Sequence, residues 1–248
     1  MEILFLGTGT STGVPQIGCE CETCLSADPK DKRLRASVLI TNNEDKILID
    51  CGPDFRQQAL SNRVNGISAV LLTHEHYDHI GGLDDIRPLG NVKIFAAETV
   101  LSVIRRNMPY CFQTEKYPGV PLIELHEIDE TPFYIHHTEI LPVRVMHANL
   151  PIFGFRIGTM AYLTDVKSIG QHEIDQLKNL DVLVLNALRP NKHFSHLSLN
   201  EAIELSDMIG AARTYFIHMS HDMGKHQEIS QLLPENIQLA YDGLKINV

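Results

Sequence analysis

The sequence predicts a single α/β domain, residues 1–248, in which two sheets carry helices on their outer sides. The composition is globular, with 44% hydrophobic and 21% charged residues. Early strands arrive in hairpin-like pairs, such as 37–41 and 46–49 around Asn42–Asp45, whereas later strands alternate with helices. No linker or low-complexity segment divides the chain. This mixture favours two sheets over one doubly wound sheet.

Short apolar runs rich in Val, Ile and Leu predict the strands, and longer amphipathic stretches predict the helices. The predicted strands are Ile3–Leu6, Ser37–Thr41, Lys46–Ile49, Ala69–Thr73, Lys93–Ala96, Leu141–Met146, Gly154–Ile157, Ala161–Leu163, Val182–Leu185, Thr214–Ile217 and Gln238–Ala240. The predicted helices are Pro53–Ser61, Ala97–Arg106, Val166–Asn179, Asn200–Ile209 and Lys225–Leu233.

Charge and hydropathy limit the partners. The 21 basic and 31 acidic residues give a net charge of −10, which disfavours a nucleic-acid partner in the absence of a basic patch. No apolar run approaches the roughly 20 residues of a membrane helix. The N-terminus MEILFLGTGT lacks the basic region of a signal peptide. We therefore expect a cytoplasmic protein without a membrane partner, and a homodimer is compatible with the sequence.

The strongest chemical signal is the motif THEHYDHIGG at residues 73–82, which follows an apolar run. It contains three histidines and an aspartate, His74, His76, His79 and Asp78. These groups can hardly all be buried without a common partner. The first two histidines can converge on one metal ion and the other two residues on a second, while Gly81 and Gly82 let the backbone pass close by. Nitrogen and carboxylate ligands without a thiolate suit zinc, with manganese and iron as alternatives.

Four residues cannot complete two coordination spheres, so further ligands must lie downstream. Three candidates stand at the carboxyl ends of predicted strands, where α/β folds commonly place their sites: His147, Asp165 and His218. Each alone would be an ordinary surface or core residue. Together, after a complete first motif, they are interpreted as metal ligands.

The HxHxDH motif with later His, Asp and His resembles the metallo-β-lactamase superfamily, from Gly7–Thr10 through Leu48–Gly52 to His218. The resemblance implies a four-layer αββα sandwich with two metals at one edge of the sheets. The implied ligands are His74, His76 and His147 for the first metal, Asp78, His79 and His218 for the second, and Asp165 as the bridge. Asp50 takes the position of the family's buried aspartate. It either orients the metal loop or merely starts the turn before Gly52.

Three of the five cysteines, Cys19, Cys21 and Cys24, form a cluster that predicts a metal site in a reducing compartment. Cys51 and Cys111 are isolated and predicted to be small buried hydrophobes. By spacing alone, His226 or Cys51 could supply a fourth ligand. The cluster is similar to a segment in the phosphodiesterases of bacterial phosphonate catabolism, which open 5-phosphoribosyl 1,2-cyclic phosphate. That resemblance implies a structural zinc with His221 as the fourth ligand.

The segment FSHLSLN, residues 194–200, is similar to the same phosphodiesterases. The resemblance implies that His196 binds the phosphate or protonates the leaving oxygen. An imidazole with a pKa near neutrality suits a general acid. The alternative is a surface histidine near a helix N-terminus.

Together these parts predict a phosphodiesterase with two catalytic divalent metals, zinc or manganese, and one structural zinc. Metals about 3.5–4 Å apart would share a hydroxide that Asp165 positions for in-line attack on phosphorus. His196 would protonate the departing sugar oxygen. The expected substrate is a small phosphodiester, with a cyclic ribosyl phosphate as the leading candidate. The match is loose around Asn186–Pro190, so the phosphodiester class is better supported than that compound. Whether Arg189 or Lys192 contacts the substrate stays open.

The sequence disfavours four other functions. Thioester hydrolases of the glyoxalase II type share the HxHxDH loop, but the cysteine cluster and His196 argue against them. RNA-processing zinc nucleases need an RNA-binding arm, and no such insert is evident. A non-catalytic binding module is disfavoured because every candidate ligand is present. An electron-transfer diiron protein would have a carboxylate where this chain has His76.

Overall fold

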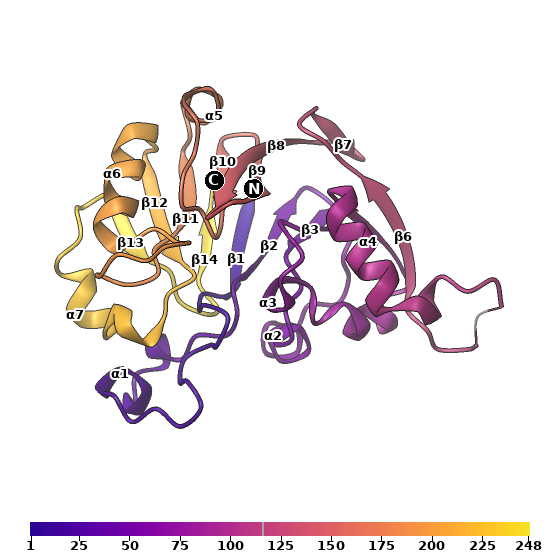
Figure 1. The fold of residues 1–248 in the computed structure, drawn as a ribbon, viewed down its shortest axis with the longest axis horizontal. Coiled ribbons are helices and arrows are strands. Elements are labelled where there is room, and N and C mark those ends of the chain that lie inside the picture. Colours follow the sequence, from indigo (N-terminus) through magenta and orange to yellow (C-terminus); the bar gives the residue numbers. More distant parts are fainter. Residues whose placement is uncertain (116) are drawn as a thin grey trace.

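Two seven-stranded sheets form the centre of the computed structural model, which describes residues 1–115 and 117–248 (Figure 1). The strands are β1 (Glu2–Gly7), β2 (Ser37–Asn42), β3 (Asp45–Ile49), β4 (Ala69–Leu71), β5 (Asn91–Ala96), β6 (Leu122–Glu127), β7 (Phe133–Ile135), β8 (Thr138–His147), β9 (Leu150–Ile157), β10 (Met160–Leu163), β11 (Val182–Asn186), β12 (Arg213–Ile217), β13 (Ile237–Leu239) and β14 (Lys245–Asn247). The helices are α1 (Glu22–Leu25), α2 (Phe55–Asn62), α3 (Tyr77–Ile80), α4 (Glu98–Asn107), α5 (Gln171–Gln176), α6 (Leu199–Ile209) and α7 (His226–Ser230).

The two sheets have the same internal organisation. The first has the order β14-β1-β2-β3-β4-β5-β6 and the second β13-β12-β11-β10-β9-β8-β7. In the first sheet, pairing is antiparallel from β14 to β3 and parallel from β3 to β6. In the second, pairing is antiparallel from β7 to β10 and parallel from β10 to β13. Parallel neighbours end at the same edge of a sheet, so residues that follow β4, β10 and β12 can meet.

Alternating side chains along the strands build three apolar layers. In β1, Ile3 and Phe5 join a core between the two sheets, whereas Leu4 and Leu6 pack in a second core with residues of α2 and α4. On the other side of the molecule, Leu183 of β11 packs with Ala202 of α6 in a third core. Figure 1 shows these helices on the outer sides of the sheets. The predicted αββα sandwich is therefore confirmed.

A capping box begins α6, the helix that follows the predicted general acid. The Ser198 hydroxyl accepts from the Glu201 backbone N–H, and the Glu201 carboxylate accepts from the Ser198 N–H at 2.8 Å. Gly210 ends the helix in the left-handed conformation, at φ 77°. The chain that enters α6, two residues after His196, is thus held in place. Of the helices in the described residues, none has the length and apolarity to cross a membrane.

The predicted helix Val166–Asn179 is wrong in its first half, since α5 covers only Gln171–Gln176. The backbone of residues 166–168 bonds elsewhere: Val166 N–H donates to the Asn186 side chain and Lys167 N–H to the Met146 carbonyl. Three strands that sequence patterning missed, β6, β7 and β14, complete the sheet edges, and α1 lies within the cysteine cluster.

Candidate metal centre

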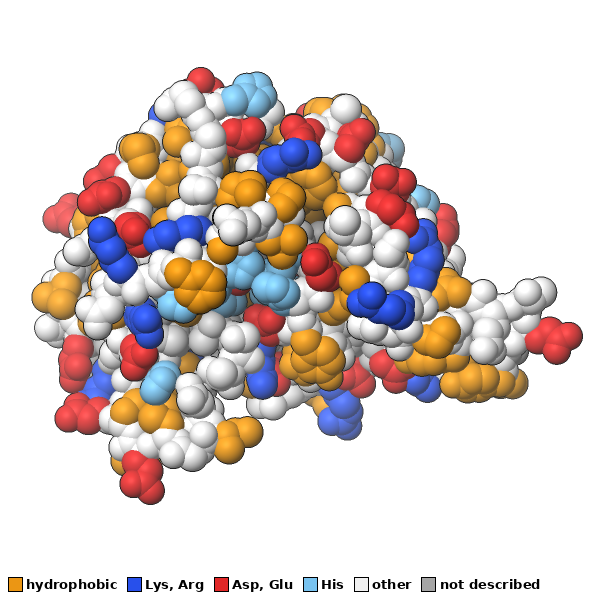
Figure 2. Space-filling view, viewed as in Figure 1, with side chains coloured by type: hydrophobic (Ala, Val, Ile, Leu, Met, Phe, Trp, Pro, Cys, Tyr) orange, Lys and Arg blue, Asp and Glu red, His pale blue; other side chains and the backbone are white. Residues whose placement is uncertain are grey.

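The candidate site lies where strands of both sheets end. His74 follows β4, His147 is the last residue of β8, Asp165 follows β10 and His218 follows β12. Figure 2 shows histidine side chains gathered near the centre of one face, where the surface is hollowed. The topology therefore brings together residues that are up to 144 positions apart, His74 and His218.

His74, His76 and His147 form one group whose ligand atoms all lie within 4.8 Å of one another. His74 Nε2 is 3.0 Å from His76 Nδ1, and the rings of His76 and His147 are 5.1 Å apart between centroids. This is the set predicted for the first metal. His74 and His147 are buried, whereas His76 is exposed.

Asp78, His79 and His218 form a second group of the same kind, the set predicted for the second metal. Asp165 lies beside it, with carboxylate oxygens 3.3 Å from His79 Nε2 and 3.3 Å from His218 Nε2. His79 Nε2 and both ring nitrogens of His218 are buried without a hydrogen-bond partner. The Nε2 atoms of His79 and His218 face these carboxylates, which fits a bound cation, because a metal ion would satisfy both kinds of atom.

The charges at the site also fit metal binding. Burial raises the pKa of Asp78 and Asp165, but His79 and His218 outweigh it and hold both values well below the usual range. Burial lowers the pKa of His74 and keeps that ring neutral. Burial also opposes charge on His79, yet the surrounding carboxylates raise its pKa well above the usual value. A metal that binds His79 must therefore displace a proton.

Asp50 contacts both ends of the loop that carries the first candidate ligands, residues 73–79. Its carboxylate accepts from the Thr73 backbone N–H at 2.9 Å and hydroxyl at 3.0 Å, and lies 2.8 Å from His79 Nδ1. The first of the two interpretations of Asp50 therefore matches its contacts. The loop also packs backbone against backbone, since a Cβ on Gly82 would lie 2.0 Å from the Gly52 carbonyl oxygen. A side chain at Gly82 would push the loop away from Asp50.

Three site residues leave their strands in the left-handed region, Asp50 at φ 61°, Asp165 at φ 57° and His218 at φ 56°. Such a conformation costs a residue with a side chain on the order of 1–3 kcal/mol, so the surrounding structure must hold it in place. The sharp turn that results directs these polar side chains back across the strand ends.

His196 lies within the centre and not on the surface. Its side chain is 12% exposed, and its Nε2 is 2.9 Å from Asp165 Oδ1. Burial lowers the pKa of His196 to about 4, although Asp165 opposes the shift. The near-neutral pKa expected from the sequence is therefore not found in the free protein.

The cysteine cluster forms a separate group of Cys19, Cys21, Cys24 and His221. The Sγ atoms of Cys19 and Cys21 are each 3.3 Å from His221 Nδ1. A backbone hydrogen bond from Cys24, together with His221, lowers the pKa of Cys21 to about 6, whereas burial raises the pKa of Cys24 to about 11. The donor set is complete for tetrahedral zinc.

The two other candidates for the fourth zinc ligand lie elsewhere. His226 Nε2 is 3.2 Å from the Leu239 carbonyl oxygen, and Cys51 is buried in the core beneath the first sheet's helices. Cys111 is buried in the same core. His221 follows His218 by three residues, so one loop serves both groups.

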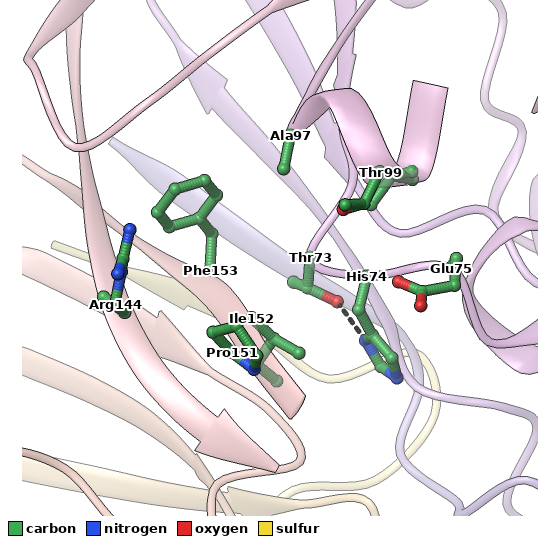
Figure 3. Close-up of a pocket in the computed structure, with 10 residues that line it drawn as sticks. Thr73, His74, Glu75, Ala97, Thr99, Arg144, Pro151, Ile152 and Phe153 are labelled. Atoms are coloured by element: carbon green, nitrogen blue, oxygen red, sulfur yellow. Dashed lines mark hydrogen bonds between the residues drawn. The ribbon is translucent and has the colours of Figure 1, made fainter. Parts of the chain in front are cut away.

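A cavity of about 170 Å³ adjoins the site and is lined by Thr73, His74, Glu75, Ala97, Thr99, Val100, Arg144, Pro151, Ile152 and Phe153. Figure 3 shows Phe153 and Ile152 on one side of the space, with Ala97 and Thr99 on another. Figure 3 also shows the Thr73 hydroxyl hydrogen-bonded to His74 Nδ1, while Nε2 on the other side of the ring lies 3.0 Å from His76 Nδ1. Apolar cavities of about 150 Å³ hold one benzene-sized ring, so this cavity fits a group of that size.

A family model described as the β-lactamase superfamily domain matches residues 45–219, most of the chain. The chain belongs to the metallo-β-lactamase superfamily. The fold of the chain agrees with that of its structural neighbours. A crystal structure titled as a new diphosphatase from the PhnP family is 39% identical, with a TM-score of 0.93, over 100% of this chain and 97% of that one. The zinc-bound PqqB of Methylobacterium extorquens shares the fold, with a TM-score of 0.81, 20% identity and full coverage of both chains.

Among curated sequences, an octanoyltransferase of Porphyromonas gingivalis is 46% identical over 251 residues, which cover 99% of this chain and 51% of that protein. The chain spans about half the length of this curated relative. Membership of the superfamily and the clusters above give this chain a metallo-β-lactamase fold with groups of side chains that fit divalent metal.

The structure brings all eleven predicted metal ligands into groups and adds contacts that sequence reasoning missed. Ser195 and His193 contact His196, and neither has a sequence signal beyond its closeness to that residue. Arg189 lies 3.4 Å from the Asp222 carboxylate, and Lys192 is exposed. A substrate contact by either stays a prediction.

Replacing Cys21 tests the group formed by the three cysteines and His221. Cys21→Ser should lose about one equivalent of zinc and lower the melting temperature, because metal-binding energy at a structural site is folding energy. Metal analysis and calorimetry measure both effects, and Cys111→Ser serves as the buried-cysteine control that should keep its zinc. Full zinc content and an unchanged melting temperature in Cys21→Ser would rule out a zinc site.

Proposed function

We propose that this protein is a metal-dependent hydrolase that cleaves small phosphodiesters, with a cyclic ribosyl phosphate as the leading substrate. The observation that carries the proposal is the position of His196, whose Nε2 lies 2.9 Å from Asp165 in the middle of the candidate ligands. A proton donor at this point is needed when the leaving group is an alcohol oxygen. The 39% identical diphosphatase supports attack at phosphorus.

The candidate ligands would hold two divalent metals, zinc or manganese, and the cysteine group a structural zinc. Bound metals supply an activated water and neutralise charge that develops on the phosphoryl oxygens. Asp165 lies between the two predicted ligand sets and also orients His196. His196 holds a proton at Nε2 and donates it to the leaving oxygen. A substrate phosphate beside the ring favours the protonated form, against the effect of burial.

The cavity beside His74 would take the organic part of the substrate. Its walls are mainly apolar, and it adjoins His74 but does not include His196. In a linear diester, the group held there would be the one on the ester oxygen that stays on phosphorus, whereas in a cyclic ribosyl phosphate one sugar carries both ester oxygens.

Thioester hydrolysis is the second candidate, favoured by one observation. The 46% identical relative is named octanoyltransferase, and acyl transfer uses activated acyl groups. Because the match covers 51% of that protein, its other half is available for the transferase activity. His196 favours the phosphodiester, since a thiolate leaves without a proton donor.

A substrate panel on the metal-loaded protein separates the two. We expect turnover of 5-phosphoribosyl 1,2-cyclic phosphate and of bis(4-nitrophenyl) phosphate, and little or none of an octanoyl thioester. Metal-stripped protein, restored by adding zinc or manganese, is the control. Faster hydrolysis of the thioester than of every phosphodiester would overturn the proposal.

A further inference from the structure

We propose that Ser195 is a positioning residue that holds both a metal ligand, His147, through its carbonyl and the proton donor, His196, through its hydroxyl. The inference rests on the proposed function, because it assigns His196 a reacting nitrogen. Ser195 is 5% exposed and would touch neither metal nor substrate itself.

The carbonyl fixes the ring of His147. The His147 Nδ1–H donates to the Ser195 carbonyl oxygen at 2.9 Å, which leaves Nε2 free for the group it forms with His74 and His76. A ligand histidine held in this way keeps one tautomer and one ring orientation.

The hydroxyl fixes the ring of His196. Ser195 Oγ is 2.9 Å from His196 Nδ1, while Nε2 on the opposite side faces Asp165. Ser195 Oγ is also 3.2 Å from His193 Nδ1, a nitrogen that accepts from the Ser195 backbone N–H. The hydroxyl can donate to His196, or accept from it while donating to His193. It therefore holds the same ring orientation in either state.

The backbone on both sides keeps Ser195 in place. Leu197 N–H donates to the carbonyl of Val166, the residue after Asp165, and Leu188 N–H donates to the Leu197 carbonyl. The Ser198 capping box then anchors the start of α6. A serine on so restrained a segment can orient two rings because its own position varies little.

Ser195→Ala separates the two contacts, because it removes the hydroxyl and keeps the carbonyl. We expect unchanged metal content and a fall of about 10–100-fold in kcat on an alkyl phosphodiester, the usual scale for a partner of an active-site group. Hydrolysis of bis(4-nitrophenyl) phosphate should change less than about twofold, because nitrophenolate needs little protonation. Ser195→Thr, which keeps a hydroxyl, should restore part of the loss. Asn191→Ala, an exposed change in the same loop, is the matched control.

A double variant shows whether Ser195 acts through His196. In a His196→Ala background, Ser195→Ala should cost nothing further, since coupled residues are not additive. Equal losses on both diesters, or full additivity, would indicate a merely structural role and overturn the inference. No loss on either diester would do so as well.

An activity-independent measurement keeps the inference apart from the proposed function. In zinc-loaded protein, ¹³C relaxation of the His196 ring should show lower order in Ser195→Ala than in the wild type or Asn191→Ala. Unchanged ring order would overturn the positioning role. Wild-type protein that hydrolyses no phosphodiester, but shows this loss of order in the variant, would overturn the proposed function alone.

Discussion

Asp165→Ala is expected to lower kcat on a chromogenic phosphodiester by about 10³-fold or more, the scale of losing several kcal/mol of transition-state stabilisation. The Asp165 carboxylate lies 3.3 Å from His79 Nε2, 3.3 Å from His218 Nε2 and 2.9 Å from His196 Nε2. Its loss therefore removes a contact of both candidate metal ligands and of the predicted proton donor. Steady-state kinetics measures the effect, and metal analysis reports how many ions remain.

The fold should survive the change, because the Cys₃His group lies apart from Asp165. Circular dichroism and the zinc content of that group check this. Asp181→Ala, which removes an exposed aspartate at the start of β11, is the matched control and should keep wild-type turnover. Near-wild-type hydrolysis by Asp165→Ala would contradict a mechanism that uses two metals.

His196→Ala should keep its metal content and yet hydrolyse alkyl phosphodiesters about 10²–10⁴-fold more slowly, the usual contribution of a general acid. The need for a proton is greatest when the leaving oxygen is a sugar or alkyl alcohol, and small for a nitrophenolate. Parallel kinetics on a ribosyl or alkyl diester and on a nitrophenyl diester measure the difference. The loss should be much larger on the first.

Each other result for His196→Ala has a defined meaning. Equal losses on both diesters would assign His196 to phosphate binding and not to proton donation. Loss of metal would indicate that His196 is itself a metal ligand. Metal content should be measured because His196 lies close to His147 and Asp165. Unchanged activity on both would contradict any role in the reaction.

The sequence was sufficient for most of the architecture. Apolar runs of strand length predicted eleven of the strands. These strands pack against the other sheet on one face and against helices on the other, so they have few polar positions. It was insufficient for residues 166–170. Their side chains suit a helix start, but the backbone bonds to Met146 and Asn186, which lie outside any local window. The edge strands β6, β7 and β14 were missed because edge positions carry polar and exposed residues.

By itself, the sequence determined the superfamily, the candidate ligands and the cysteine cluster, because motif spacing and residue chemistry are local properties. The predicted roles of the ligands and of His196 stay predictions. Only the tertiary structure decided that Asp50 holds Thr73 and His79, that burial depresses the pKa of His196, and that Ser195 contacts two histidines. These properties depend on which distant segments meet at the strand ends, and left-handed turns at residues such as Asp165 direct the side chains there. The spacing of residues along the chain does not predict which distant segments come into contact.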